Sequence, residues 1–339
     1  MSFAKYVTFE CFVKYDMMNR KVIVYKDAPM EEVLSEPADD TETLLKVRAW
    51  EVEESPTDLG YQLVKDWTKM PSEWKLGGVV SAAMDTKGRY YILHRGKEAP
   101  SIICFDRESG EVISSWGKGD FMFAHSLKCD KKDNIWMVDS ASPRSKVASE
   151  GGHCLYLYSP EGKVLKTLGT KGVWGEDGTH FKGPTDIAWN SNGEFYVSDG
   201  YINNRIARFD KDLKFFAQWG CEGTGKGQFT LPHAITIDAE GLVYVCDRTK
   251  WRVEIFNPKG TFLRQWTHIG KTCDIQYMPD GHIWILDGST KRVTKLDRSG
   301  NIVGFFDTIK TAHAFGVAPN GDIITCHRLD GTFQLFSQK

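Results

Sequence analysis

The sequence predicts an all-β fold: a six-bladed β-propeller whose ring is closed by an N-terminal strand. Three observations support this prediction. One two-strand unit recurs six times, its copies are spaced 40 to 60 residues apart, and helical periodicity is almost absent. Four antiparallel strands in every 40-odd residues are typical of propeller blades. The 339 residues are therefore interpreted as one ring preceded by an extension.

The repeated unit consists of an apolar strand, a polar turn and a second strand rich in aromatic and β-branched residues. The turn positions of the six copies are Gly88, Asp133, Gly193, Gly241, Gly281 and Gly321. Third strands such as RIARFD follow, and most fourth strands end in a bulky residue such as Trp219. The sixth unit lacks a fourth strand, but YQLVKDW, which ends at Trp67, has the fourth-strand pattern. We expect this segment to close the ring, because closure removes exposed sheet edges.

This organisation predicts two parts, a six-bladed catalytic propeller at residues 61–339 and an extension at residues 1–60. In the extension, the runs KYVTFECFVKYD and RKVIVYKD predict a hairpin that packs on the propeller or mediates a homo-oligomer. A short helix is expected only within residues 29–48, where Pro37 interrupts it. The polar insertion at residues 140–153 is either a lid or binding loop, or an inert surface loop.

The composition limits which partners are expected and indicates the cellular compartment of the protein. The chain has 43 Lys and Arg against 45 Asp and Glu, so neither nucleic acid nor a membrane is expected as a partner. No apolar run approaches the roughly 20 residues that span a bilayer, and the first residues lack the apolar middle of a signal peptide. The 8 cysteines are widely spread without a CxxC pair. We therefore expect no disulfide framework and a cytoplasmic location.

A register argument locates the candidate site. In a propeller the first strand of each blade lines the central channel and the second strand is its antiparallel neighbour. A residue eight before the turn and one seven or eight after it therefore lie on the same face of the ring. The residues eight before the six turns are Val80, His125, Thr185, His233, Cys273 and His313. Histidines thus occupy blades two, four and six, which places three imidazoles around the axis.

Three imidazoles around one axis indicate a metal centre. Neutral imidazole is a common zinc ligand, and three protein ligands with an open fourth position are typical of catalytic zinc sites. We therefore predict that His125, His233 and His313 bind zinc, with another divalent transition metal as the alternative. The structural alternative is that each histidine only satisfies local hydrogen bonds at the start of a strand. We expect the substrate to be a small molecule.

The same register adds three polar side chains to this face. Arg95 and Arg248 lie seven residues after a turn, and Tyr201 lies eight after one. Arginine suits a carboxylate or a developing oxyanion, and tyrosine near cations suits a general base. The alternative is that these side chains only solvate loop ends. Six residues after the turn, four blades carry Asp, which we interpret as structural, accepting backbone N–H bonds from the following turn.

The register and the segments HRG, PTDIAWNSNGEFYVSDGYINNRIARFD and CDRTKWRVEIF resemble the NHL-repeat peptidyl-α-hydroxyglycine α-amidating lyases over residues 61–339. The resemblance implies an NHL-type propeller that splits an α-hydroxyglycine amide into an amide and glyoxylate. It also implies that the three histidines are zinc ligands, the tyrosine the base and the two arginines active-site residues. In that family an Asp after the third ligand helps to bind structural calcium. Ala314 stands there, so calcium is not expected.

The sequence thus predicts a metal-dependent lyase that acts on a small hydroxylated or carbonyl substrate with an anionic group. Two alternatives stay open at this level. One is a metal-dependent hydrolase or hydratase that uses metal-bound water at the same site. The other is a non-catalytic NHL module that binds a protein.

Overall fold

The computed structural model describes residues 10–16, 21–26, 44–48, 56–141 and 152–338. The chain divides into two compact units, Met1–Ser55 and Pro56–Lys339. The first unit is an antiparallel sheet with the strand order β2-β1-β3. Its strands are β1 (Glu10–Asp16), β2 (Lys21–Lys26) and β3 (Leu44–Arg48).

Two expectations for this unit have different outcomes. β1 and β2 pair antiparallel, and the residues that would connect them as the expected hairpin, 17–20, lie outside the described residues. Residues 44–48, which the helix prediction covered, form β3 instead, because they pair with the free edge of β1 and tertiary pairing overrides local propensity. The other residues of the expected helix, 29–43, lie outside the described residues.

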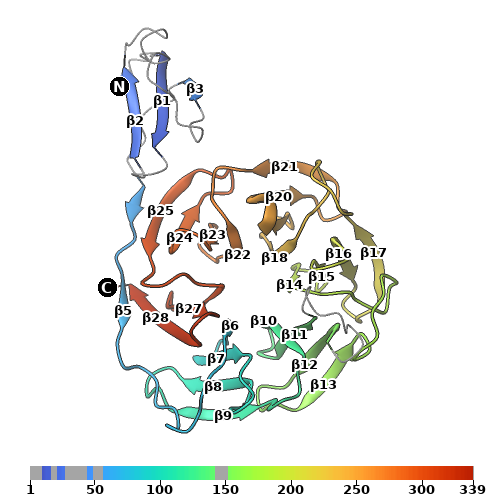
Figure 1. Cartoon of the computed structure of the whole chain (residues 1–339). Coiled ribbons are helices and arrows are strands. Elements are labelled where there is room, and N and C mark those ends of the chain that lie inside the picture. The colour runs from blue at the N-terminus through green and yellow to red at the C-terminus, as the bar shows by residue number, and fades with distance from the viewer. Residues whose placement is uncertain (1–9, 17–20, 27–43, 49–55, 142–151, 339) are drawn as a thin grey trace. The chain divides into compact units, whose positions relative to one another are not determined.

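The second unit consists of six sheets arranged around a central axis, with the first strand of each sheet innermost and the fourth outermost (Figure 1). Blades 1 and 2 contain β6 (Val79–Met84), β7 (Arg89–His94), β8 (Ile102–Asp106), β9 (Val112–Trp116), β10 (Phe123–Cys129), β11 (Ile135–Ser140), β12 (Cys154–Tyr158) and β13 (Val164–Leu168). Blades 3 and 4 contain β14 (Asp186–Trp189), β15 (Phe195–Asp199), β16 (Arg205–Phe209), β17 (Phe215–Trp219), β18 (Pro232–Ile237), β19 (Val243–Asp247), β20 (Arg252–Phe256) and β21 (Phe262–Trp266).

Blades 5 and 6 contain β22 (Thr272–Tyr277), β23 (Ile283–Asp287), β24 (Arg292–Leu296), β25 (Ile302–Asp307), β26 (Ala314–Val317), β27 (Ile323–His327) and β28 (Thr332–Gln338). The outer strand of blade 6 is β5 (Tyr61–Val64), which pairs antiparallel with β28, so that Leu335 faces Val64. This pairing confirms that an N-terminal strand closes the ring. A further short strand, β4 (Thr57–Asp58), pairs in parallel with β25 at the outer edge of blade 5.

The turn that identified each repeat has the conformation that its residue type suggests. All six turn residues have positive φ, from 62° at Asp133 to 89° at Gly321. Glycine adopts this left-handed region without steric cost, and aspartate is among the residues that tolerate it. The six turns therefore give a reliable origin for counting residues along the blades.

The core lies between the blades as six clusters of buried apolar side chains, one for each neighbouring pair of blades. Trp67 lies three residues beyond the end of β5 and contacts the rings of Tyr90 and Phe105. The closing segment therefore supplies both the missing strand of blade 6 and a side chain that fills the joint with blade 1.

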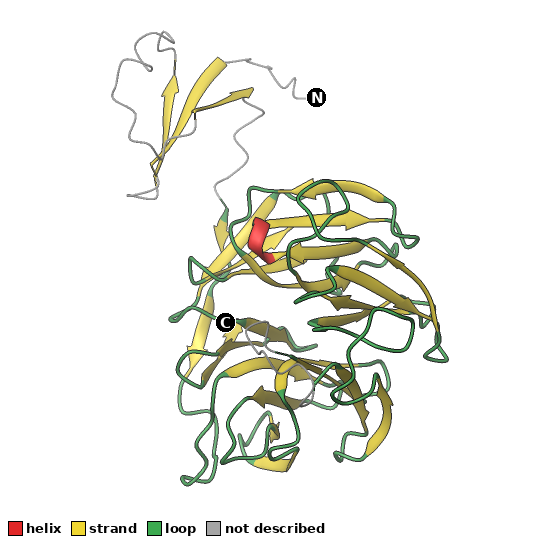
Figure 2. Cartoon of the chain, turned by 45° about the vertical axis from the view of Figure 1, so that its right-hand side comes forward, coloured by secondary structure: helices red, strands yellow, loops and turns green. Residues whose placement is uncertain are grey.

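The described residues contain strands and one short helical turn, η2 (Arg248–Lys250), shown in red in Figure 2. Nowhere in the described part of the chain is there a helix with the length and apolar character to cross a membrane. The described cysteines of the propeller are free thiols, and most of them are buried. Residues 142–151 of the predicted insertion lie outside the described residues.

Candidate active site

The residue eight before each turn lies either at an irregularity of the innermost strand or directly before that strand. In blades 1, 2, 4 and 5 the pairing register with the second strand shifts across Val80, His125, His233 and Cys273. These shifts are β-bulges, in which one extra residue leaves the ladder and its side chain is re-aimed. In blades 3 and 6 the equivalent residues, Thr185 and His313, immediately precede the first strand.

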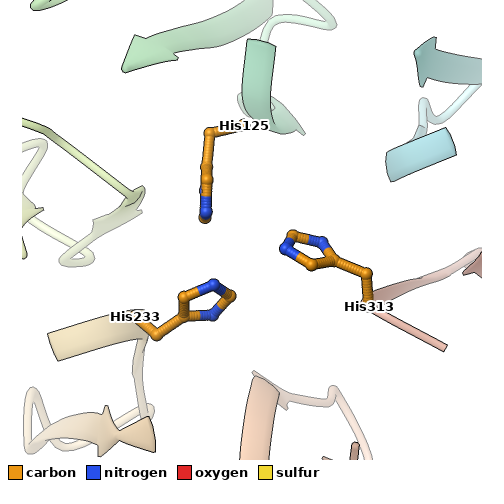
Figure 3. Close-up of side chains that lie close together, drawn as sticks. All are labelled: His125, His233 and His313. Carbon is orange, nitrogen blue, oxygen red and sulfur yellow. The ribbon is translucent and has the colours of Figure 1, made fainter. Parts of the chain in front are cut away.

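This shared register position brings the three histidines together. His125, His233 and His313 are buried, and the three imidazoles converge on the axis (Figure 3). One ligand nitrogen from each ring lies within 4.8 Å of the others, and the ring centroids are 4.7 to 5.3 Å apart. The predicted three-histidine cluster is therefore present in the structure.

The outer nitrogen of each imidazole is held by a backbone carbonyl of the next blade. The Nδ1 atoms of His125, His233 and His313 lie 2.7, 2.7 and 2.9 Å from the carbonyl oxygens of Thr185, Cys273 and Val80, respectively. A carbonyl only accepts, so each Nδ1 carries the proton and the lone pair resides on Nε2. Ligating histidines usually donate their second ring N–H in this way, which sets ring orientation.

The electrostatic environment keeps the imidazoles neutral. Burial is the largest cause that holds the pKa values of His125 and His233 well below the usual value and lowers the pKa of His313 to about 3. The positive charges of Arg95 and Arg248 act in the same direction. Neutral nitrogens that converge from three sides fit a divalent transition metal, because metal ligands must be deprotonated.

The structure also brings Tyr201 and Arg248 to this cluster. The Tyr201 hydroxyl lies 3.0 Å from Nε2 of His125, and Nη1 of Arg248 lies 2.7 Å from Nε2 of His233. Both groups are donors, so they point at lone pairs that a metal would also use. They would therefore border any ion that the three histidines hold.

Arg95 approaches from the neighbouring first blade. Its Nε donates to the carbonyl of Ala124 at 2.7 Å, and its guanidinium lies over the Phe123 ring with Cζ 3.5 Å from the centroid. Burial lowers the pKa of Arg95 to about 10, although an interaction with Tyr201 opposes this shift. Its Nη2 is buried without a hydrogen-bond partner among the described residues, so this group has unused capacity for an anionic ligand.

Beneath the histidines a buried ionic network ties their strands together. Asp186 accepts from Ser126 Oγ at 2.5 Å and from the backbone N–H of Ile235 at 3.1 Å, which links the strands of His125 and His233. Lys128 Nζ lies 3.5 Å from Asp186. Burial lowers the pKa of Lys128, but the carboxylates outweigh this effect, so the ammonium stays charged.

A second buried carboxylate completes the network. Asp274 accepts from the backbone N–H of Phe315 at 2.9 Å, two residues after His313, and lies close enough to Lys128 to share its charge. Burial raises the pKa of Asp274. Each histidine strand is thus attached to a common charged centre on the axis.

The four aspartates six residues after the turn have the structural role that was expected, but mostly with other partners. Asp287 accepts from Ser289 N in the following turn. Asp139, Asp199 and Asp247 instead accept backbone N–H groups from the loop before the first strand of their own blade. That loop leads directly into the residue at the axis. The aspartates therefore anchor the approach to the site.

Sequence reasoning missed the ionic network, although a signal existed. The row that follows the histidine row, seven before each turn, reads Ser81, Ser126, Asp186, Ala234, Asp274 and Ala314. Two aspartates in a channel-lining row would have indicated a buried charge. The carbonyl partners of the histidines had no such signal, because every residue type has a carbonyl.

Comparison with known proteins agrees with the geometry. The chain is 32% identical to rat peptidylglycine alpha-amidating monooxygenase over 272 residues, which are 70% of this chain and 26% of the relative. It is 31% identical to peptidyl-alpha-hydroxyglycine alpha-amidating lyase 1 of Drosophila melanogaster over 257 residues, 64% of this chain and 45% of the relative. It is 30% identical to human NHL repeat-containing protein 3 over 240 residues, 67% and 66% of the two chains.

The protein is an NHL-type β-propeller that resembles the amidating lyases. A comparison of the chain with protein-family models gave no match. Among solved structures, a virginiamycin B lyase from Staphylococcus aureus superimposes with a TM-score of 0.53 at 16% identity, covering 79% of this chain and 81% of that one. At this identity the likeness supports the fold alone.

Proposed function

We propose that the NHL-type propeller is a metal-dependent lyase that acts on an α-hydroxyglycine derivative or a closely related small hydroxylated substrate with an anionic group. The observation that carries the proposal is the convergence of three neutral imidazoles with Tyr201, Arg95 and Arg248. This set combines a metal centre, an acid–base group and cations. The names of several relatives describe an amidating lyase, which supports the same reaction class.

Zinc or another divalent transition metal, held by His125, His233 and His313, would supply Lewis acidity at the substrate hydroxyl. Tyr201 is placed beside that position and would take the hydroxyl proton. The electron pair of the O–H bond then forms the new carbonyl, and the C–N bond breaks with its electron pair on nitrogen. A proton delivered to that nitrogen completes the amide product and leaves glyoxylate.

Arg248 and Arg95 have two roles in this scheme. Their guanidinium groups hold the carboxylate of the substrate by charge-assisted hydrogen bonds. Their charges also complement the phenolate form that Tyr201 must adopt before it accepts the hydroxyl proton, since Arg95 interacts with Tyr201 and the Arg248 Cζ lies 6.0 Å from the Tyr201 ring centroid. The buried surroundings strengthen these interactions because they exclude water.

The test begins with metal analysis of the purified protein and continues with glyoxylate release from α-hydroxyhippurate. About one transition metal per chain and metal-dependent glyoxylate release are expected. Failure to bind zinc after reconstitution would disprove the proposal. Hydrolysis or hydration of other substrates without glyoxylate release would favour the alternative use of the same metal for water activation.

Tyr201→Phe separates the base from the metal ligands. Removal of the hydroxyl should lower kcat by about 100-fold or more, as expected for loss of general acid–base catalysis, while metal content stays at the wild-type value. Full activity in this variant would show that Tyr201 is not the base. Loss of metal would show that its role is structural.

The cytoplasmic location is also proposed, on the free thiols of the propeller's described cysteines. Cell fractionation tests it, and recovery of the chain in a secretory compartment would contradict it.

A further inference from the structure

A cavity of about 390 Å³ opens beside His313, between blades 4, 5 and 6. Its lining includes three basic side chains, Arg248, Lys271 and Arg328, and no Asp or Glu. The volume lies within the range of small-molecule sites in proteins. Since Arg248 also contacts His233, the cavity and the three-histidine cluster form one continuous site.

The cations that line this cavity face one another without a carboxylate among them. Several other basic side chains of the propeller pair with acids, as Arg298 does with Asp238 and Arg208 with Glu194. Within the part of the chain that the structure describes, neither Lys271 nor Arg328 has an ion-pair partner. Three like charges around one cavity repel each other unless an anion enters.

These three side chains line the cavity together with His313 and Cys273, and their charges act on those two groups. Burial is the main cause that lowers the pKa of His313, and the charge of Arg328 contributes to it. Burial raises the pKa of the Cys273 thiol, and Arg248 and Lys271 oppose that rise from the cavity side. Arg95, in blade 1, already supplies a cation near Tyr201. One carboxylate on the substrate would not neutralise all four charges.

The rim of the cavity is apolar. Trp251 is 51% exposed and Leu329 is 81% exposed, and both line the cavity. Trp251 has φ 54°, at a turn position where the corresponding residue of blade 6 is Gly331. A bulky aromatic residue in this conformation is rare, and an exposed one provides a flat apolar surface for a ligand.

We propose that the substrate carries a second anionic group, bound by Lys271 and Arg328, in addition to the carboxylate beside Arg248 and Arg95. The linking part of the substrate lies against Trp251. The chemical class is an N-acylated α-hydroxyglycine whose acyl group ends in a carboxylate. This inference rests on the proposed function for the reaction, but its binding test does not require turnover.

The test uses two unreactive analogues of equal length, N-succinylglycine and N-butyrylglycine, which differ in the second carboxylate. Isothermal titration calorimetry on the zinc-loaded full-length protein should show about tenfold tighter binding of N-succinylglycine, because one charge-assisted contact is added. Lys271→Gln and Arg328→Gln should each remove most of this preference and leave the affinity for N-butyrylglycine unchanged. Lys250→Gln, an exposed lysine on η2 outside the cavity lining, is the matched control and should keep the preference.

The outcomes separate the two proposals. Three results would overturn the second anion site. The two analogues bind with equal affinity, neither analogue binds, or Lys271→Gln weakens the binding of both analogues equally. If N-succinylglycine is preferred but no glyoxylate is released from the hydroxylated compounds, the anion site stands and the lyase proposal fails. If glyoxylate is released with equal kcat/KM from N-succinyl- and N-butyryl-α-hydroxyglycine, the lyase proposal stands and the second anion site fails.

Discussion

The six blades share one strand pattern, but at the axis they separate into two sets of three. The even blades contribute the imidazoles of His125, His233 and His313, whereas each odd blade contributes a backbone carbonyl at the same register position. In the odd blades the residues at this position are Val80, Thr185 and Cys273, three different types, because the carbonyl does not depend on the side chain. The comparison shows that one register position supports the proposed metal centre in two ways, through side chains that would bind and through carbonyls that orient.

The comparison predicts that ligand and orienting positions respond differently to side-chain replacement. His233→Ala should abolish tight metal binding and glyoxylate release, because two imidazoles remain. Cys273→Val should leave metal affinity unchanged, since the carbonyl that His233 contacts is retained. Competition with a chelator measures both affinities. A loss in Cys273→Val equal to that in His233→Ala would contradict the division between the two sets.

The next largest effect is expected when the ionic network below the histidines loses its cation. Lys128→Met leaves Asp186 and Asp274 buried without their cation, and should destabilise the fold by about 3–5 kcal/mol, as is usual for breaking a buried ion pair. Urea denaturation measures this loss. Adding Asp186→Asn should recover part of it. If Lys128→Met alone has wild-type stability, the network does not hold the even-blade strands together.

A third prediction concerns a carboxylate far from the axis in blade 4. Burial raises the pKa of Glu254 to about 7, although Arg252 lies 3.2 Å away, and one of its oxygens lacks a partner among the described residues. A raised carboxyl pKa stabilises the fold below the unfolded pKa near 4.3, and this contribution is lost as the pH rises to 7. Glu254→Gln removes this loss of stability at high pH, because the amide does not ionise.

The variant should therefore gain stability relative to wild type at pH 8 but not at pH 4, by less than about 3 kcal/mol. Denaturation midpoints measured across this pH range test the sign. Relative stabilisation that is larger at pH 4 than at pH 8 would contradict it. Glu194→Gln is the control, because that carboxylate pairs with Arg208 at a partly exposed position.

Most of the architecture was predictable because its signals are local. Turn residues such as Gly193 and Asp133 recur at blade spacing, and counting from them placed the histidines of alternate blades in one row. The missing fourth strand of blade 6 identified the closing segment, which β5 confirms. The short strand β3 was missed because it depends on a partner, β1, that lies about thirty residues earlier in the chain.

The site was predictable in part. Residue counting alone placed Tyr201, Arg95 and Arg248 on the histidine face, because antiparallel pairing is regular on either side of the turn. Lys271 and Arg328 were not recognised, since their significance lies in the absence of acidic partners. Such an absence depends on all the neighbours of a side chain and has no sequence pattern.

The sequence by itself determined the number of blades, the closure of the ring and the row that contains the three histidines. These features follow from strand periodicity and turn chemistry, which act over a few residues. Only the tertiary structure decided which carbonyls orient the imidazoles, how Lys128 joins the strands beneath them, and which cations remain unpaired at the cavity. Those features depend on groups from different blades that meet only when the ring closes.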